Sequence, residues 1–241
     1  MHDDGVDVSK APARIAGMFD AIAGRYDFLN HFLSAGIDRR WRRRAIASLR
    51  LTGHERVLDL CSGTGDLAIA ALRAHPSAAR VIGIDFAAAM LAVGARKIER
   101  EGVRGRIELV RGDAMRIPIA GGSVDAVTIA FGIRNVADLV AACREIHRVL
   151  KPAGRLAILE FAVPTTPGFS QLYLWYLHSV LPRLGRAISR HEGAYNYLQA
   201  SIDAFVKPAE LVTILRQSGF VEIDPVPLTF GSVFLYVARR G

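Results

Sequence analysis

The sequence has few of the features that mark exported, membrane-spanning or metal-binding proteins. It contains only two cysteines, Cys61 and Cys143, and its acidic, polar N-terminus does not resemble a signal peptide. No run of about 18 apolar residues is present that could form a spanning helix. The seven histidines have no metal-ligand spacing, so we predict no metal site. We therefore expect a cytoplasmic protein with reduced thiols.

The chain is nevertheless rich in apolar residues and in arginine. Its 241 residues are 51% hydrophobic, which is enough for the core of one α/β domain with helical additions. The net charge is +8, and the densest basic run is residues 39–44, Arg39-Arg40-Trp41-Arg42-Arg43-Arg44. On a helix these arginines would spread around most of the circumference, with Trp41 available as an anchor. Such a run suits nucleic acid, an anionic membrane surface or an ordinary solvated helix end.

Hydrophobic periodicity predicts alternating strands and helices after an N-terminal helical extension over residues 1–50. Residues 1–11 are expected to be disordered, and residues 12–35 and 38–50 helical, with Gly36 as a break. Strands and helices then alternate: strands 56–60, 80–84, 106–110, 124–130 and 154–161, and helices 65–74, 87–100 and 137–150. This order predicts a parallel sheet with helices on both faces. Residues 151–154 read as a turn into the fifth strand, and residues 228–239 as a final strand paired with 221–224.

One segment breaks this rhythm within the predicted main domain, residues 51–241. Residues 168–189 form an unusually apolar helical stretch with arginines at its far end, within an insertion of about 165–200. It precedes the last predicted helix, residues 208–218. We interpret it as a lid over a substrate pocket, with packing on the N-terminal helices as the alternative.

The most informative stretch follows the first predicted strand, where Val57-Leu58 leads to Asp59 and a turn containing Gly63 and Gly65. This order places a nucleotide at the carboxyl end of the strand. The glycines let the backbone approach the ligand, and the following helix offers free N–H groups. The turn alone also fits the loose dinucleotide pattern.

Two further acids narrow the choice of nucleotide. Asp85 ends the second strand about 20 residues beyond the turn, where a ribose-binding carboxylate is expected. Asp113, in Gly112-Asp113-Ala114, follows the third strand. Acids at the ends of three strands suit a charged amino-acid tail, a ribose and an adenine amine. S-adenosylmethionine has all three groups, whereas NAD has no ammonium tail for Asp59 to attract.

The whole pattern resembles class I S-adenosylmethionine-dependent methyltransferases, and closely resembles the quinone C-methyltransferases of menaquinone and ubiquinone biosynthesis. The most distinctive motif is Phe131-Gly132-Ile133-Arg134-Asn135. The other stretches that carry the resemblance are residues 26–30, 34–41, 58–66, 148–152, 159–161, 195–198 and 201–202. The resemblance implies a Rossmann-like, seven-stranded, mostly parallel sheet. It also implies cofactor contacts at Thr64, Asp85, Asp113 and Ala114.

The chemistry of ring methylation assigns further roles. A ring carbon of a hydroquinone becomes nucleophilic when a hydroxyl group loses its proton. Arg134, at the mouth of the fourth strand, can stabilise the phenolate or orient a water, but it stays protonated and is a poor base. Tyr26 and Asn135 can hold the hydroxyl group. The candidate bases are His31, His178 and His191.

Alternative functions are weighed on the same residues. A nucleic-acid methyltransferase is disfavoured because Phe131-Gly132-Ile133-Arg134-Asn135 stands where base-amine enzymes often carry an Asn/Asp-Pro-Pro-aromatic motif, so no nucleic-acid partner is expected. A sterol or other small-molecule methyltransferase stays open. A non-catalytic binding module would have lost the three acids Asp59, Asp85 and Asp113.

The preferred substrate is a prenylated quinol, demethylmenaquinol giving menaquinol, with a ubiquinone-pathway benzoquinol as the alternative. A prenylated substrate lives in the bilayer, so we expect peripheral contact with an anionic membrane at its inner face. Residues 39–44 and 168–190 are the predicted contacts. The sequence leaves a homodimer open.

Overall fold

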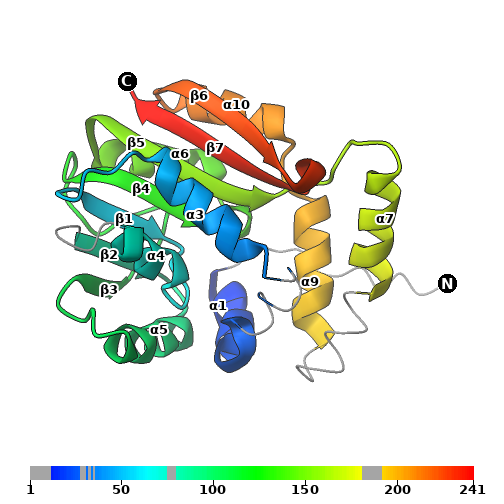
Figure 1. Cartoon of the computed structure of the whole chain (residues 1–241), viewed down its shortest axis with the longest axis horizontal. Coiled ribbons are helices and arrows are strands. Elements are labelled where there is room, and N and C mark those ends of the chain that lie inside the picture. The colour runs from blue at the N-terminus through cyan, green and yellow to red at the C-terminus, as the bar shows by residue number, and fades with distance from the viewer. Residues whose placement is uncertain (1–11, 28–30, 32–33, 35, 75–79, 181–191) are drawn as a thin grey trace.

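The computed structural model describes residues 12–27, 31, 34, 36–74, 80–180 and 192–241 (Figure 1). The disorder predicted for residues 1–11 lies outside these residues. So do residues 181–191, which hold the basic end of the predicted insertion and His191.

The core of the fold is a seven-stranded sheet of order β3-β2-β1-β4-β5-β7-β6. Its strands are β1 (Arg56–Leu60), β2 (Arg80–Asp85), β3 (Ile107–Arg111), β4 (Val124–Ala130), β5 (Leu150–Phe161), β6 (Phe220–Leu228) and β7 (Val233–Arg240). Strands β1 to β5 pair in parallel, and β7 runs antiparallel to both β5 and β6. This confirms the predicted mostly parallel sheet. The strand order reverses between β1 and β4, where open α/β sheets bind ligands beyond the carboxyl ends of the strands.

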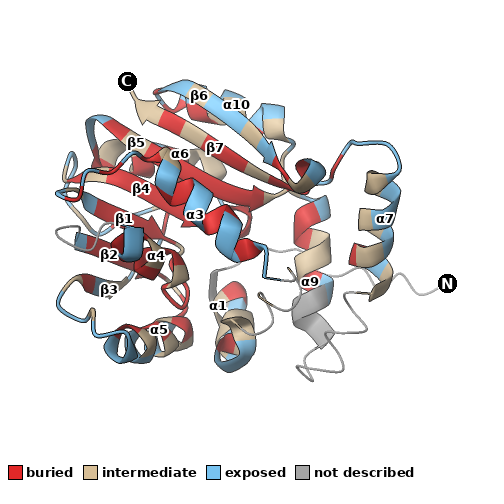
Figure 2. Cartoon of the chain, viewed as in Figure 1, coloured by how far each residue is buried: buried red, intermediate tan, exposed pale blue. Residues whose placement is uncertain are grey.

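Helices cover both faces of the sheet, so the central strands are buried (Figure 2). The longer helices are α1 (Pro12–Ile22), α3 (Asp38–Ser48), α4 (Asp66–Ala74), α5 (Ala88–Arg100), α6 (Leu139–Val149), α7 (Phe169–Trp175), α9 (Glu192–Asp203) and α10 (Pro208–Gln217). Apolar residues of α3, α4 and α5 form one buried cluster with the sheet, and those of α6 and α10 form another. Because α3 shares this core, it packs as part of the sheet domain. The boundary predicted at residue 50 stays a prediction.

Three local expectations are corrected. The helix predicted over residues 12–35 is interrupted: α1 ends at Ile22, a 3₁₀ turn spans Ala23–Arg25, and Tyr26, Asp27 and His31 are again helical. Tertiary contacts explain the break, because Asp20 accepts the backbone N–H of Ala89 and Asp27 accepts the hydroxyl of Thr64. The insertion is not one helix, because α7 passes into a π-helical turn, Tyr176–Val180. The turn predicted at residues 151–154 is an irregular start of β5, with a shifted register opposite β4.

The arginine run also differs from its sequence-based interpretation. Trp41 and Arg42 are both only 8% exposed on the inner side of α3, so Trp41 is not an exposed anchor. Arg42 forms an ion pair with Asp38, which is itself buried. A buried carboxylate needs such a partner, so the run splits into an inner arginine and an outer basic row.

Candidate functional site

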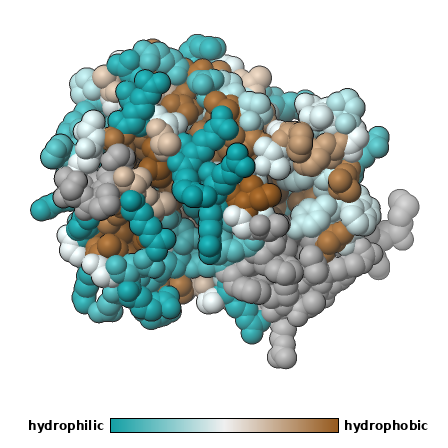
Figure 3. Space-filling model, viewed as in Figure 1, coloured by the Kyte–Doolittle hydropathy of each residue, from teal (hydrophilic) through white to brown (hydrophobic). Residues whose placement is uncertain are grey.

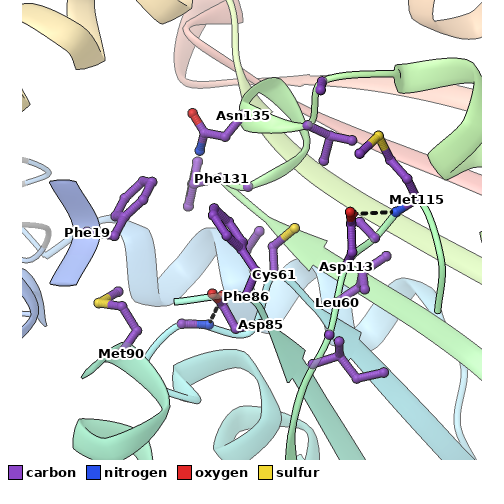
Figure 4. Close-up of a pocket in the computed structure, with 18 of the residues that line it drawn as sticks. Phe19, Leu60, Cys61, Asp85, Phe86, Met90, Asp113, Met115, Phe131 and Asn135 are labelled. Atoms are coloured by element: carbon purple, nitrogen blue, oxygen red, sulfur yellow. Dashed lines mark hydrogen bonds between the residues drawn. The ribbon is translucent and has the colours of Figure 1, made fainter. Parts of the chain in front are cut away.

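A cavity opens at the carboxyl edge of the sheet, at the switch point between β1 and β4, and about 770 Å³ of space lies in it and in the solvent at its mouth. Figure 4 shows Asp85 and Asp113 entering it from the ends of β2 and β3, with Phe131 and Asn135 opposite. A second hollow of about 340 Å³ adjoins it. Both are lined by Tyr26, Cys61, Gly63 and Ala130.

The turn after β1 needs an unusual backbone. Cys61, Gly63 and Gly65 have φ values of 55°, 55° and 78°, in the left-handed region that favours glycine. A Cβ on Gly63 would also come within 3.3 Å of the Met90 methyl group. Gly63 therefore keeps the cavity floor open, as the sequence predicts.

Gly132 in the turn after β4 is required for a different reason. A Cβ at this position would lie 2.3 Å from the Cβ of Cys61. Only glycine lets the turns after β1 and β4 pack closely enough to form the two sides of one site.

Asp85 is tied into the turn before any ligand is considered. Its Oδ2 accepts the N–H of Gly63 at 2.8 Å, and its Oδ1 accepts the N–H of Ala87 at 2.9 Å. Burial raises the pKa of this carboxyl group, and the two N–H bonds act in the opposite direction. Each oxygen keeps a further lone pair, so Asp85 can still accept hydroxyl groups from a ribose in the cavity.

Asp113 and Ala114 line the far wall of the same cavity. Asp113 Oδ1 accepts the N–H of Met115 at 2.8 Å, which fixes the carboxylate at the end of β3 (Figure 4). Its other oxygen accepts no hydrogen bond among the described residues, so it can accept one from an amine such as that of adenine.

Asp59 lies at the bottom of the smaller hollow and is 1% exposed. Its carboxylate accepts the hydroxyls of Ser62 and Thr128, each at 2.9 Å. Burial raises its pKa to about 6, against the lowering effect of these bonds. A cation in this hollow would favour the ionised form of the carboxylate.

The rim of the smaller hollow is built from charged groups that the sequence did not connect. Thr64 donates its hydroxyl to Asp27 at 2.5 Å and accepts from Lys97 at 3.1 Å. Arg42 also lines the hollow, and its Nη2 lies 3.7 Å from Asp66. This end of the site therefore presents both signs of charge, as a zwitterionic amino-acid tail requires.

Arg134 and Asn135 belong to a 3₁₀ turn, Ile133–Asn135, directly after β4. Asn135 lines the cavity, whereas the Arg134 side chain is buried beside it and is not part of the lining. Arg134 Nη1 donates to Phe131 O at 2.5 Å and to Glu160 Oε1 at 2.9 Å, and Nε donates to Ser201 at 3.2 Å. Arg134 therefore joins the mouth of β4 to β5 and α9.

A second bond holds α9 against this turn. The Tyr197 hydroxyl donates to Asn135 Oδ1 at 3.1 Å. Burial raises the pKa of Tyr197, so the phenol keeps its proton and remains a donor at neutral pH. The Asn135 amide is thereby left with its NH₂ group for a ligand.

Two of the predicted histidine bases, His31 and His178, lie away from the cavity. His31 Nδ1 is 2.8 Å from Asp38, and His178 Nδ1 is 2.6 Å from the Gln199 amide. Neither is part of the cavity lining, and His191 is outside the described residues. The assignment of a base therefore stays a prediction.

In the described part of the chain, no group of three or more His, Cys, Asp or Glu side chains is placed to hold a metal ion. In the same residues, no helix is both long and apolar enough to cross a membrane.

Sequence reasoning missed several residues that shape the site. The apolar side chains of Phe19, Met90 and Phe131 line the cavity. A signal for Phe19 was present, because it follows the buried Ile15 by one helical turn. No local signal identifies Arg42 as an inward-facing residue, since four other arginines stand within three positions of it in the sequence.

The residues present fit S-adenosylmethionine, and the fold defines the class of protein. Asp85 faces a cavity whose floor a Cβ on Gly63 would narrow, and Asp59 lies in an adjoining charged hollow. A methyltransferase structure from Aquifex aeolicus, described as S-adenosylmethionine-dependent, matches with a TM-score of 0.61 and 17% identity over 83% of this chain and 89% of that chain. The [4+2]-cyclase SpnF matches with a TM-score of 0.68 and 17% identity over 94% of both chains. Such distant matches show a class I methyltransferase fold and nothing about the reaction.

The family follows from closer relatives. The model of the ubiE/COQ5 methyltransferase family matches residues 7–240. A ubiquinone/menaquinone biosynthesis C-methyltransferase UbiE of Geobacter sp. (strain M21) is 43% identical over 97% of this chain and 99% of its own length. A demethylmenaquinone methyltransferase of Thermus thermophilus is 45% identical over 92% of this chain and 100% of its own length. The chain belongs to the ubiE/COQ5 methyltransferase family, and it is an S-adenosylmethionine-dependent methyltransferase.

Proposed function

We propose that this enzyme methylates a ring carbon of a prenylated quinol, converting demethylmenaquinol to menaquinol. The observation that carries the proposal is one cavity with two chemically different ends. Asp85 and Asp113 form the nucleotide end, whereas Phe19, Phe131 and Asn135 form an apolar wall with one amide. The names of the relatives, which include demethylmenaquinone methyltransferase, support the same reaction.

At the nucleotide end, the residues hold the cofactor. When bound, S-adenosylmethionine supplies an electrophilic methyl group. Asp85 would accept the ribose hydroxyls, and Asp113 and Ala114 would hold the adenine. Asp59, Thr64 and the turn containing Gly63 and Gly65 would hold the tail in the smaller hollow.

At the substrate end, Asn135 and Tyr26 hold the ring hydroxyl. Arg134 acts from behind the cavity wall. Its Nε and Nη1 are engaged, and Nη2 donates no hydrogen bond to a described residue, so Nη2 is the atom that can stabilise the phenolate or orient a water. Its pairing with Glu160 prevents the guanidinium from turning away.

The reaction balances without a metal or an oxidant. The quinol hydroxyl would give its proton to a base, and the ring carbon would form a bond to the methyl carbon as the sulfur–methyl bond breaks, with the electron pair of that bond left on sulfur. Loss of the hydrogen on that carbon as a proton would restore aromaticity, and return of one proton to the oxygen would give the quinol, so the reaction releases one proton in all.

The test is incubation of the full chain with methyl-labelled cofactor and reduced demethylmenaquinol, followed by mass identification of the product. A parallel reaction receives the demethylated benzoquinol. Labelled menaquinol is the expected product. If only the benzoquinol were labelled, the substrate would be the benzoquinol and not demethylmenaquinol. If neither quinol were labelled, the proposal would be refuted.

A further inference from the structure

One edge of the molecule exposes a cluster of large apolar side chains. Val163, Leu172, Trp175 and Phe230 are 40%, 58%, 58% and 68% exposed, and we call them the apolar edge. The ring of Phe169 in α7 lies 4.9 Å from that of Phe230, so α7 packs against the turn that carries Phe230. The chain after β5 runs beside the same turn, because Ala162 N–H donates to Ser232 O.

The backbone holds Phe230 outward at a conformational cost. Thr229, Phe230 and Gly231 form the 3₁₀ turn η4, and all three have positive φ values, of 44°, 56° and 86°. Left-handed backbone is unfavourable for threonine and phenylalanine. Trp41 Nε1 donates to the Thr229 hydroxyl at 3.0 Å and the Thr166 hydroxyl donates to Phe230 O at 3.3 Å. A fixed, strained turn that displays an aromatic ring to solvent indicates a functional surface.

The apolar edge lies close to the wall of the active site. Phe131, which lines the cavity, packs against Trp41 with ring centroids 6.0 Å apart. Phe131 also packs against Phe161 at 4.5 Å. Because Trp41 bonds to Thr229, one layer of aromatic side chains separates the catalytic cavity from the turn that carries Phe230.

A basic surface adjoins this edge through α3. Arg39, Arg40, Arg43 and Arg44 are exposed on α3. A broad groove beside the helix is lined by Arg39, Arg43 and Arg100 and by the carboxylates of Asp27, Asp66 and Glu101, and none of these three arginines forms an ion pair with a described residue. Figure 3 shows long hydrophilic side chains and hydrophobic patches together on the face that carries α3 and α7. The combination of exposed aromatic residues and unpaired arginines matches an anionic bilayer.

We propose that this face docks on an anionic membrane, with Phe230 and Trp175 entering the interface and Arg39 and Arg43 meeting lipid phosphates. The inference rests on the proposed function, because a prenylated quinol must reach the cavity from the bilayer. Aromatic side chains, tryptophan above all, favour the membrane–water interface, where the apolar ring contacts lipid and a polar group can contact water. Docking by this face would place the wall of the cavity next to the bilayer in which the prenylated quinol is dissolved.

The test is flotation of the full chain with phosphatidylglycerol-containing vesicles and with pure phosphatidylcholine vesicles. The double variant Phe230→Asn, Trp175→Ser should lower partitioning onto the anionic vesicles by about tenfold or more. Asn suits the left-handed backbone at position 230, so folding should be preserved. The variant Arg39→Ser, Arg43→Ser should lower it by roughly fivefold per arginine at low salt, and less at high salt.

Two control variants match these changes elsewhere on the surface. Val221→Ser removes an exposed apolar residue of β6, and Arg80→Ser with Arg104→Ser removes two exposed charges. Neither should change partitioning. Wild-type protein that does not float, or variants that float as well as wild type, would overturn the inference. So would a wild-type dimer that the Phe230→Asn, Trp175→Ser variant dissociates without lipid, because a second copy would then cover the edge.

Activity separates this inference from the proposed function. The membrane variants should methylate a short-chain, water-soluble demethylnaphthoquinol at the wild-type rate and slow down only with long-chain quinol in vesicles. A wild-type protein that does not methylate the water-soluble quinol would refute the proposed function alone. An unchanged vesicle reaction in the variants would refute the docking face alone.

Discussion

Replacement of Arg134 by lysine is the sharpest test of the substrate end of the site. The guanidinium holds three acceptors from three parts of the chain: Phe131 O, Glu160 and Ser201. Lysine keeps the charge but replaces the planar fork by a single ammonium group. It can stay paired with Glu160, but it cannot also keep the bond to Ser201 and supply the second guanidinium nitrogen that we propose acts on the phenolate.

The size of the effect follows from these bonds. Loss of hydrogen bonds from a charged donor should lower the free energy of unfolding by about 2–3 kcal/mol. Loss of one positioned donor to a developing phenolate should lower kcat by about 10²–10³-fold. Affinity for S-adenosylmethionine should be unchanged, because Arg134 lies outside the lining formed with Asp85 and Asp113.

Three measurements on the same variant decide the matter: kcat with demethylmenaquinol, cofactor affinity by calorimetry and a denaturant melt. Arg155→Lys is the matched control, since Arg155 is half-buried and its Nη1 donates to Leu49 O away from the cavity. Ser201→Ala removes only the partner of Nε and should lower kcat less. A kcat equal to that of wild type in Arg134→Lys would remove Arg134 from the mechanism.

Three further predictions concern the nucleotide end. Asp85→Ala should weaken cofactor binding by about 2–4 kcal/mol in calorimetry, whereas replacement of the exposed Asp224 by alanine should not. Equal cofactor affinities of Asp85→Ala and wild type would contradict the assignment of Asp85 to the ribose. The pKa of Asp59 is raised to about 6, so its burial favours the protonated folded state at low pH, and this contribution to stability is lost as pH rises through about 6. A cationic tail would lower that pKa, so cofactor affinity should increase as pH rises through about 6, and binding below this pH should release a proton. Thr128→Val should alter this proton release. A cofactor affinity that does not depend on pH would disprove the assignment. Arg42→Lys should raise KM for the cofactor by about tenfold with little change in kcat, because the planar guanidinium that lines the smaller hollow is lost. Arg43→Lys, on the outer side of α3, is the control. Equal KM values for the two variants would exclude a role of Arg42 in cofactor binding.

The nucleotide end could be predicted from the sequence because its signals are local. Each predicted acid follows an apolar strand directly, and the glycines stand within a few residues of Asp59. In a parallel sheet the strand ends meet at one edge, so the order of the elements alone brings Asp59, Asp85 and Asp113 to the same side. The structure confirms the sheet and places all three acids at the two hollows.

The substrate end could be predicted only in part, because its contacts join residues far apart in the chain. Arg134 meets Glu160 across 26 positions, and Tyr197 meets Asn135 across 62. Trp41 donates a hydrogen bond to Thr229 across 188 positions. The sequence gives no sign of this pairing, so the prediction that Trp41 is an exposed anchor was wrong. Periodicity describes one element at a time and carries no information about such pairings.

The two ends of the site are also held by different kinds of interaction, and this has a consequence for substrate choice. Asp85 is fixed by backbone N–H groups of Gly63, in the turn after β1, and of Ala87, just after β2, so any change there disturbs the sheet edge itself. The wall near Asn135 is held instead by side-chain bonds from α9, through Tyr197 and Ser201. Side-chain bonds can be replaced one at a time without rebuilding the sheet. Differences in quinol preference among relatives should therefore be found in α9, while the acids at the strand ends stay fixed by the backbone they support.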